Sequence, residues 1–203
     1  MRRKHAAKNA SRSVTRGLLS ALVCSSPLLI VACARDSYSI GESGPGGGVV
    51  FYASDRPFPC GPDLAESCRF LEAAPVDGEV LRVWAEPPYV DSDVANARGL
   101  AVGTGWSNTI AIITQGNTDP DVSAAAYADA YEHNGYSDWY LPSKDEIFEL
   151  YEHRGTVGAS EQNNYWTSSG YDFNTVWNQS FVEGPQHRRL KFDKITVRPV
   201  RAF

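Results

Sequence analysis

Hydrophobic and polar residues alternate most regularly in the C-terminal third of the chain. Val176, Asn178 and Ser180 alternate with Trp177, Gln179 and Phe181 over 175–181, and this period of two is typical of a β-strand. The runs 165–168 and 194–200 predict two further strands. Closer to the N-terminus, the runs 49–52 and 69–74 also predict strands, and the first of them follows a glycine-rich turn at 44–48. Three prolines within 56–62 predict a loop between these two strands.

A first helix is expected after position 119. Asp119 is a suitable N-cap and Pro120 suits the first helical position. Apolar residues then recur at helical spacing, at Ala124, Tyr127, Ala128 and Tyr131. Asn134-Gly135 predicts the end of this helix.

A second helix is predicted from Ser143. The tetrapeptide 143–146 matches a capping box, in which Ser143 and Glu146 each bond the backbone N–H of the other. We expect this helix to end near Arg154-Gly155, whereas the stretch 75–105 is predicted to be irregular. The order of elements predicts one α+β domain with short antiparallel sheets.

The N-terminal segment has the pattern of an export signal. Six basic residues precede an apolar stretch at 17–32, and the small residue Ala32 stands directly before Cys33. With Ile30 and Ala32 at the −3 and −1 positions, the segment resembles the lipobox of bacterial lipoproteins. The resemblance implies cleavage before Cys33 and acylation of its sulfur, which would anchor the protein to a membrane. The alternatives are an ordinary secretory signal and a membrane helix broken by Pro27.

This interpretation divides the chain into a signal peptide at 1–32, a lipidated tether at 33–42 and a domain at 43–203. It places the protein in the cell envelope. Ala34 is not the aspartate that resembles an inner-membrane retention signal, so the outer membrane is favoured if the host has two membranes.

The predicted mature chain is strongly acidic. Removing residues 1–32 takes away six Lys/Arg and no Asp/Glu from the 19 basic and 24 acidic residues, which leaves a net charge of −11. Such a charge disfavours nucleic acid as a partner, because that partner needs a cationic face.

Cys60 and Cys68 are the two cysteines of the predicted domain. In an oxidising compartment, this pair predicts a local disulfide. A metal site would need further ligands, and no Cys-x-x-Cys or neighbouring histidine supplies them. We therefore predict no metal site and no cofactor.

One basic run stands out against the acidic background. Positions 187–201 hold six of the mature chain's thirteen Lys/Arg, of which Arg188, Arg189, Lys191 and Lys194 are the candidate ligand-binding residues. Arginines in such a patch could hold sulfate or phosphate groups. One alternative is that these charges pair with carboxylates inside the fold or simply solvate a hairpin. Another is that the site lies around Trp106, Trp139 and Tyr171.

No enzymatic motif is present. The chain has no Gly-x-Ser-x-Gly and no His-Glu-x-x-His sequence, and neither His133 nor His153 has a convincing nucleophile or orienting acid beside it. Paired aspartates at 91 and 93 and at 119 and 121 could ligate calcium, but in turns they more often form Asx-turns or caps. The sequence predicts a protein that is not an enzyme.

Six ordered motifs resemble one known family. They are Ile40–Tyr52 with its Gly-Pro-Gly-Gly-Gly core, Leu71–Pro75, Gly103–Thr109, Asn134–Ser143, Tyr165–Ser169 and Val197–Phe203. Together they resemble the C-terminal domain family of the Legionella collagen-like adhesin. The resemblance implies a C-type-lectin-like fold with paired terminal strands, at Val49–Tyr52 and Val197–Val200, two helices and a loop-rich half.

The resemblance also implies a function. Binding of sulfated polysaccharide, adhesion and trimeric assembly are associated with that family. This chain departs from it in two ways, since it has no Gly-x-y collagen stalk and its domain is acidic. We therefore expect a binding or adhesion module for a polysaccharide, or alternatively an envelope scaffold that binds a surface protein.

Overall fold

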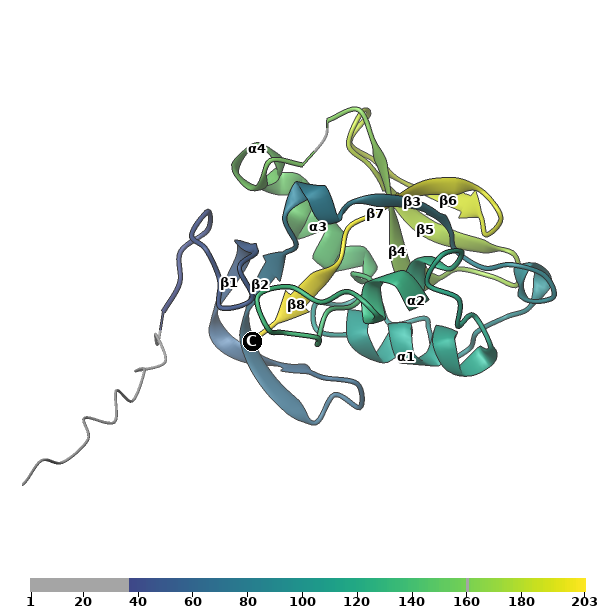
Figure 1. Ribbon diagram of the computed structural model, residues 1–203, viewed down its shortest axis with the longest axis horizontal. Coiled ribbons are helices and arrows are strands. Elements are labelled where there is room, and N and C mark those ends of the chain that lie inside the picture. The colour runs from purple at the N-terminus through teal and green to yellow at the C-terminus, as the bar shows by residue number, and fades with distance from the viewer. Residues whose placement is uncertain (1–36, 160) are drawn as a thin grey trace, which may run out of the picture. The chain divides into compact units, whose positions relative to one another are not determined.

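The computed structural model describes residues 37–159 and 161–203. The predicted signal peptide at 1–32 and the predicted acylation site Cys33 lie outside these residues. In chain order, the elements are β1 (Val49–Cys60), β2 (Glu66–Ala73), a 3₁₀ turn at Val76–Gly78, β3 (Val80–Val83), a 3₁₀ turn at Tyr89–Asp91, α1 (Gly105–Gln115), α2 (Ala124–Asp129), α3 (Lys144–Glu152), α4 (Arg154–Val157), β4 (Asn164–Gly170), β5 (Thr175–Ser180), β6 (Gln186–Leu190), β7 (Lys194–Val197) and β8 (Val200–Ala202) (Figure 1). The domain is therefore α+β, as the sequence predicts. No helix in the described part of the chain is long and apolar enough to cross a membrane.

The smaller sheet has the order β1-β2-β8 and is antiparallel. The predicted direct pairing of the first and last strands is wrong, because β2 lies between them and Ala73 of β2 faces both Val49 and Val200. The predicted strand 194–200 is also interrupted. It splits around Pro199 into β7 and β8, which belong to different sheets, because proline has no N–H to donate to a neighbouring strand.

The hairpin of β1 and β2 is longer than predicted. Residues 56–60 belong to β1 rather than to a loop, and Phe58 and Cys60 pair with Cys68 and Glu66 of β2. The prolines are tolerated because β1 is an edge strand and its register shifts between Ala53 and Phe58. The Cys60–Cys68 disulfide joins the two arms of this hairpin, which confirms the predicted pairing.

The larger sheet has the order β3-β7-β4-β5-β6, so β6 is an edge strand. All its pairings are antiparallel except the contact of β4 with β7. Alternation places Val176 in a core with Trp84, Trp166 and Ile112. Tyr165 and Phe181 belong to a second core with Tyr140 and Ile147, which covers the sheet's other face. The alternating side chains of β5 therefore point toward two cores on opposite faces of the sheet, rather than toward one core and solvent.

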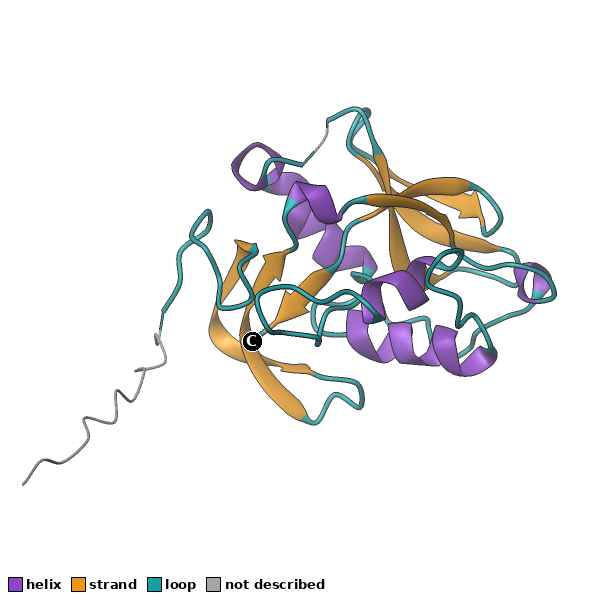
Figure 2. Cartoon of the chain, viewed as in Figure 1, coloured by secondary structure: helices purple, strands orange, loops and turns teal. Residues whose placement is uncertain are grey.

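The helices are partly as predicted. α3 begins after Ser143 with both bonds of the capping box, as the sequence indicates. The helix expected from Asp119 begins only after Ser123, because Asp119 accepts the N–H of Asp121 in a turn instead. α1 was not expected, and it packs beside α2 (Figure 2). Three residues of its buried face, Gly105, Asn108 and Thr109, are glycine or polar residues, so a hydrophobic pattern does not mark this face in the sequence.

Candidate functional site

The structure separates the residues of the predicted basic patch. Arg188 and Arg189 are neighbours in β6, so their side chains project from opposite faces of the strand. Arg188 is exposed and pairs across the sheet with Trp177, whereas Arg189 lies opposite Val176 and its Nη1 is 3.5 Å from an Asp193 oxygen. Lys194 is exposed at the start of β7.

Lys191 is buried and does not belong to an exposed patch. Only 1% of the residue is accessible, and its ammonium donates to the backbone carbonyls of Ser92 and Phe173. Burial lowers the pKa of this lysine, while nearby aspartates raise it. The ammonium also lies 5.0 Å from the ring centroid of Trp84. Lys191 therefore holds the turn at 171–174 against the segment around Ser92.

Two further arginines of the basic run also pair inside the fold. Arg198 is buried and lies 3.1 Å from a Glu79 carboxylate oxygen. Arg201 contacts Glu72 at 3.0 Å and also Asp138. The alternative that the basic residues pair with carboxylates inside the fold is thus correct for Arg198 and Arg201. Arg188 and Lys194 remain the fully exposed cations of the run.

Four aromatic and cationic side chains contact one another in a row, which we call the aromatic–cationic strip. It consists of Lys144, Trp177, Tyr171 and Arg188. The Lys144 ammonium lies 5.2 Å from the ring centroid of Trp177, and the Tyr171 and Trp177 rings meet edge to face at 5.3 Å. The guanidinium of Arg188 lies 4.6 Å from the ring centroid of Tyr171. Tyr171 is 39% exposed, so its ring is accessible from solvent.

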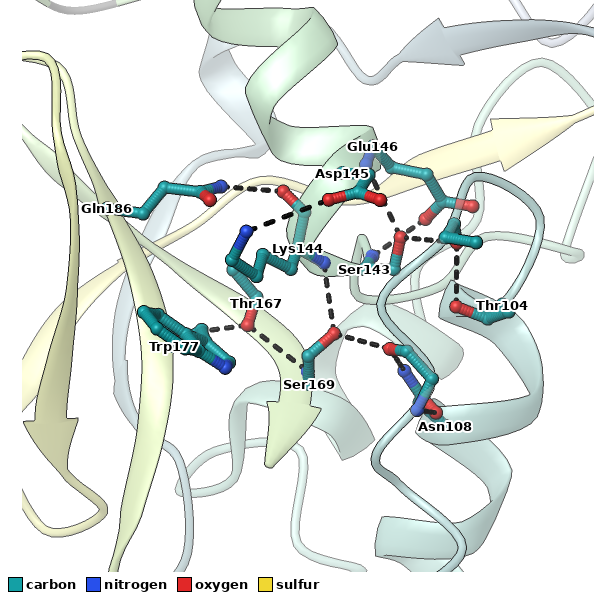
Figure 3. A network of polar contacts seen from close by, with 12 residues as sticks. Thr104, Asn108, Ser143, Lys144, Asp145, Glu146, Thr167, Ser169, Trp177 and Gln186 are labelled. Carbon is teal, nitrogen blue, oxygen red and sulfur yellow. Dashed lines mark hydrogen bonds and ion pairs between the residues drawn. The ribbon is translucent and has the colours of Figure 1, made fainter. Parts of the chain in front are cut away.

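Hydrogen bonds fix the backbone at Lys144, one end of the strip. The N–H of Lys144 donates to the hydroxyl of Ser169 at 3.0 Å, and this hydroxyl donates to the carbonyl of Gly99. The carbonyl of Lys144 accepts from the Gln186 amide at 2.7 Å (Figure 3). The first residue of α3 is therefore tied to both β4 and β6, and its side chain is held over Trp177.

The N-terminus of α3 depends on one buried carboxylate. Glu146 accepts the N–H of Ser143 at 2.7 Å and that of Gly103, before α1, at 2.8 Å. The hydroxyl of Tyr140 donates to the same carboxylate at 3.3 Å. Burial raises the pKa of Glu146 to about 7, although these hydrogen bonds act in the opposite direction. The carboxylate thus joins the starts of two helices beneath the strip.

Tyr171, one of the two rings of the strip, lies in the turn between β4 and β5. The N–H of Tyr171 donates to the carbonyl of Thr175 at 3.0 Å, and Asp172 accepts the N–H groups of Asn174 and Thr175. Burial acts to raise the pKa of Asp172, but these hydrogen bonds and the nearby Arg188 lower it below the usual value. Asp172 therefore carries a negative charge that orders the turn.

An exposed ring, Tyr171, beside a half-buried ring, Trp177, and two cations suits the binding of sugars. The ring faces contact the apolar C–H faces of pyranoses, and the cations bind hydroxyl, carboxylate or sulfate groups.

The three residues of the alternative site predicted from the sequence have different environments. Trp139 is fully buried and Trp106 stacks on Tyr140, whereas Tyr171 belongs to the strip. The sequence places Trp177 on a strand, but the pairing of Trp177 with Arg188 depends on the register of β6.

The acidic side chains of the described residues form no metal site. Among residues 37–159 and 161–203, no group of three His, Cys, Asp or Glu side chains is arranged to hold a metal ion. Asp93 instead pairs with Arg98 at 2.8 Å, and Asp119 organises its turn.

A comparison with the models of known protein families found no match, and a comparison with curated protein sequences found none either.

Proposed function

We propose that this chain is an exported lipoprotein whose domain, residues 43–203, binds polysaccharide at the cell envelope. The aromatic–cationic strip is the observation that carries the proposal. Hydrogen bonds hold the backbone of Lys144 and the turn that carries Tyr171 before any ligand arrives, and such preorganisation lowers the entropy cost of binding.

The charges of the strip favour a polysaccharide with acidic groups. Lys144 and Arg188 lie beside the two rings, on a domain whose net charge is otherwise strongly negative. The surrounding carboxylates repel a polyanion at long range, whereas the two cations attract its sulfate or carboxylate groups at short range. Binding through the strip should therefore be weak and sensitive to salt.

For the fold we propose the C-type-lectin-like class. Support comes from the family resemblance and from the return of the last strand, β8, to the sheet that contains β1 and β2. The long connections before, between and after α1 and α2, at 84–104, 116–123 and 130–143, agree with the expected loop-rich half. The resemblance also suggests a trimer.

The proposal is tested by binding of dextran sulfate to the purified chain, measured by calorimetry. We expect Tyr171→Ala to weaken binding at least tenfold, because stacking on an aromatic ring is lost. Phe192→Ala is the matched control, since Phe192 is an exposed aromatic in the neighbouring turn and is not a member of the strip. Equal affinity of Tyr171→Ala and the wild type would contradict the proposal.

A protein-binding scaffold is the second candidate. The observation in its favour is that Phe173 and Phe192, in adjoining turns, are 56% and 58% exposed. Exposed apolar side chains of this size favour a protein partner. Under this candidate, Phe173→Ser would release a partner from the envelope fraction, whereas Tyr171→Ala would leave polysaccharide affinity unchanged.

A further inference from the structure

β6 leaves one edge of the larger sheet open. It is the last strand in the order β3-β7-β4-β5-β6, and no strand of the described chain pairs with its other side (Figure 1). A groove of about 530 Å³ lies against β6, and its lining includes every residue of the run 187–190. Consecutive residues of a strand point to opposite faces, so a groove that contacts all four reaches the edge of the strand. Arg188 belongs to this run, and the groove therefore adjoins the aromatic–cationic strip.

The register of β6 on β5 decides which backbone groups face the open edge. Just beyond the strand, the N–H of Lys191 donates to the carbonyl of Asn174 at 3.1 Å. Opposed residues of antiparallel strands exchange such bonds at every second position, so His187 and Arg189 bond to β5. Three residues turn their N–H groups to the open edge instead: Gln186, Arg188 and Leu190.

These three N–H groups have no hydrogen-bond partner within the part of the chain that the structure describes. The carbonyls of Gln186 and Arg188 face the same edge, whereas the carbonyl of Leu190 accepts the N–H of Asp193 at 3.0 Å. An open edge of this kind is a template for a further strand, and several peptide-binding domains bind extended peptides in this way. β6 therefore offers three donors and two acceptors to an added strand.

The charge of β6 argues against a second copy of this chain as the partner. The two-fold pairing of β6 with itself that joins all three open residues is centred on Arg188, which would lie opposite its own copy. Like charges directly opposite each other destabilise a pair of strands, whereas opposite charges stabilise it. The edge therefore favours a partner strand with an acidic side chain at this position.

Arg188 is also the cation of β6 that is most accessible to a partner. His187 lies 3.2 Å from Glu183 and Arg189 lies 3.5 Å from Asp193, so both already have a carboxylate beside them. Arg188 is exposed, and its guanidinium lies against the Tyr171 ring. An added strand would thus meet one exposed arginine at the middle of β6, between two ion pairs.

We propose that the open edge of β6 binds an extended acidic peptide of a partner protein as an added strand, with an aspartate or glutamate opposite Arg188. The open backbone groups of β6 supply affinity, and Arg188 supplies the preference for acidic sequences. The same arginine deters pairing with copies of β6, which makes the edge selective. This peptide-binding surface goes beyond the proposed polysaccharide site, although the two share Arg188.

The test is amide hydrogen exchange of the purified chain, measured by NMR with and without a probe peptide. The probe is a blocked peptide of about nine residues that alternates glutamate and valine, which is long enough to span β6. It should slow exchange at least tenfold at Gln186, Arg188 and Leu190. Exchange at His187 and Arg189, which already bond to β5, should not change. Unchanged exchange at the three open positions with millimolar peptide overturns the inference.

Two control peptides separate strand addition from attraction between charges. The same glutamate–valine peptide with N-methyl groups at alternate residues keeps its charge but cannot complete the hydrogen bonds, and it should bind at least tenfold more weakly. A lysine–valine peptide of equal length should not bind. Equal affinity of the methylated and unmethylated peptides would show that charge alone holds the peptide, and this result also overturns the inference.

Two variants test the edge itself. Leu190→Pro removes an N–H at the open edge and none that bonds to β5, and proline is tolerated at such positions. It should weaken peptide binding at least tenfold and leave dextran sulfate binding unchanged, which separates this inference from the proposed function. If Leu190→Pro fails to fold, Arg188→Glu replaces it, and this variant should bind the lysine–valine peptide in place of the glutamate–valine peptide. Wild-type peptide affinities in the folded variant contradict the inference.

Discussion

Lys191 and Lys194 lie three positions apart, but only Lys194 reaches solvent. The Lys191 ammonium donates to two backbone carbonyls, whereas Lys194 projects from the start of β7. In the sequence, the two lysines are equivalent members of one basic run. Burial gives them different roles, and only Lys194 is available to a ligand.

We expect Lys191→Ala to lower the free energy of unfolding by about 2 kcal/mol, because it leaves the carbonyls of Ser92 and Phe173 without their donor. Lys194→Ala should change that free energy by less than about 0.5 kcal/mol, as is usual for an exposed residue. Urea unfolding of the two variants measures both values. Equal stabilities would show that the Lys191 contacts contribute nothing.

Glu146 makes the stability of the domain depend on pH. Its pKa in the folded protein is about 7, above the ordinary value of 4.5, so the folded state retains this proton after the unfolded state has lost it. The free energy of unfolding should therefore fall by roughly 3 kcal/mol as pH rises from about 4.5 to about 7, and the contribution of this group should be constant above that range.

Glu146→Gln isolates this contribution, because glutamine does not titrate. The wild type should lose stability relative to this variant between pH 5 and about 7.5, when both are followed by urea unfolding at several pH values. Parallel pH profiles for the two proteins would mean that Glu146 does not titrate in this range.

At the scale of elements, local signals predict local structure. α3 is evident in the sequence because its capping box and its apolar face lie within nine consecutive residues. α1 could not be predicted from the local sequence. The N–H of Gly103, just before the helix, donates to Glu146, which is distant in the sequence, and the polar residues Asn108 and Thr109 lie on the buried face. Hydrophobic periodicity carries no signal for such a helix.

The candidate site also depends on contacts between distant elements. The aromatic–cationic strip combines α3, the turn after β4, β5 and β6. Alternation in β5 predicts that Trp177 and Asn178 face opposite sides, but it does not identify their neighbours. The register that pairs Trp177 with Arg188 decides which residue of β6 joins the strip.

At the scale of the whole molecule, the predicted lipid anchor decides where the domain acts. We expect Cys33→Ala to abolish labelling by palmitate and to release the protein from membranes, because the acylated sulfur is removed. Metabolic labelling and membrane fractionation measure the two effects. Unchanged labelling in Cys33→Ala would show that the segment ending at Ala32 is not a lipobox.

The acidic charge of the domain shapes its function as well. We expect the net charge of −11 on the predicted mature chain to repel nucleic acids and long polyanions at long range, so that an acidic ligand would bind only through a small local cationic site. Much of the basic run is used inside the fold, at Lys191, Arg198 and Arg201. Arg188, which is exposed, and Lys144, which is half-buried, are therefore the cations that remain beside Tyr171 and Trp177.

A glycan array probed with the wild-type chain tests the central claim, polysaccharide binding, most directly. It is read at about 0.1 M and about 1 M sodium chloride, which shortens the screening length from about 10 Å to about 3 Å. We predict that sulfated or carboxylated glycans bind at the lower salt concentration and are lost at the higher one. An array without any glycan bound at either concentration would contradict the account and would favour a protein partner.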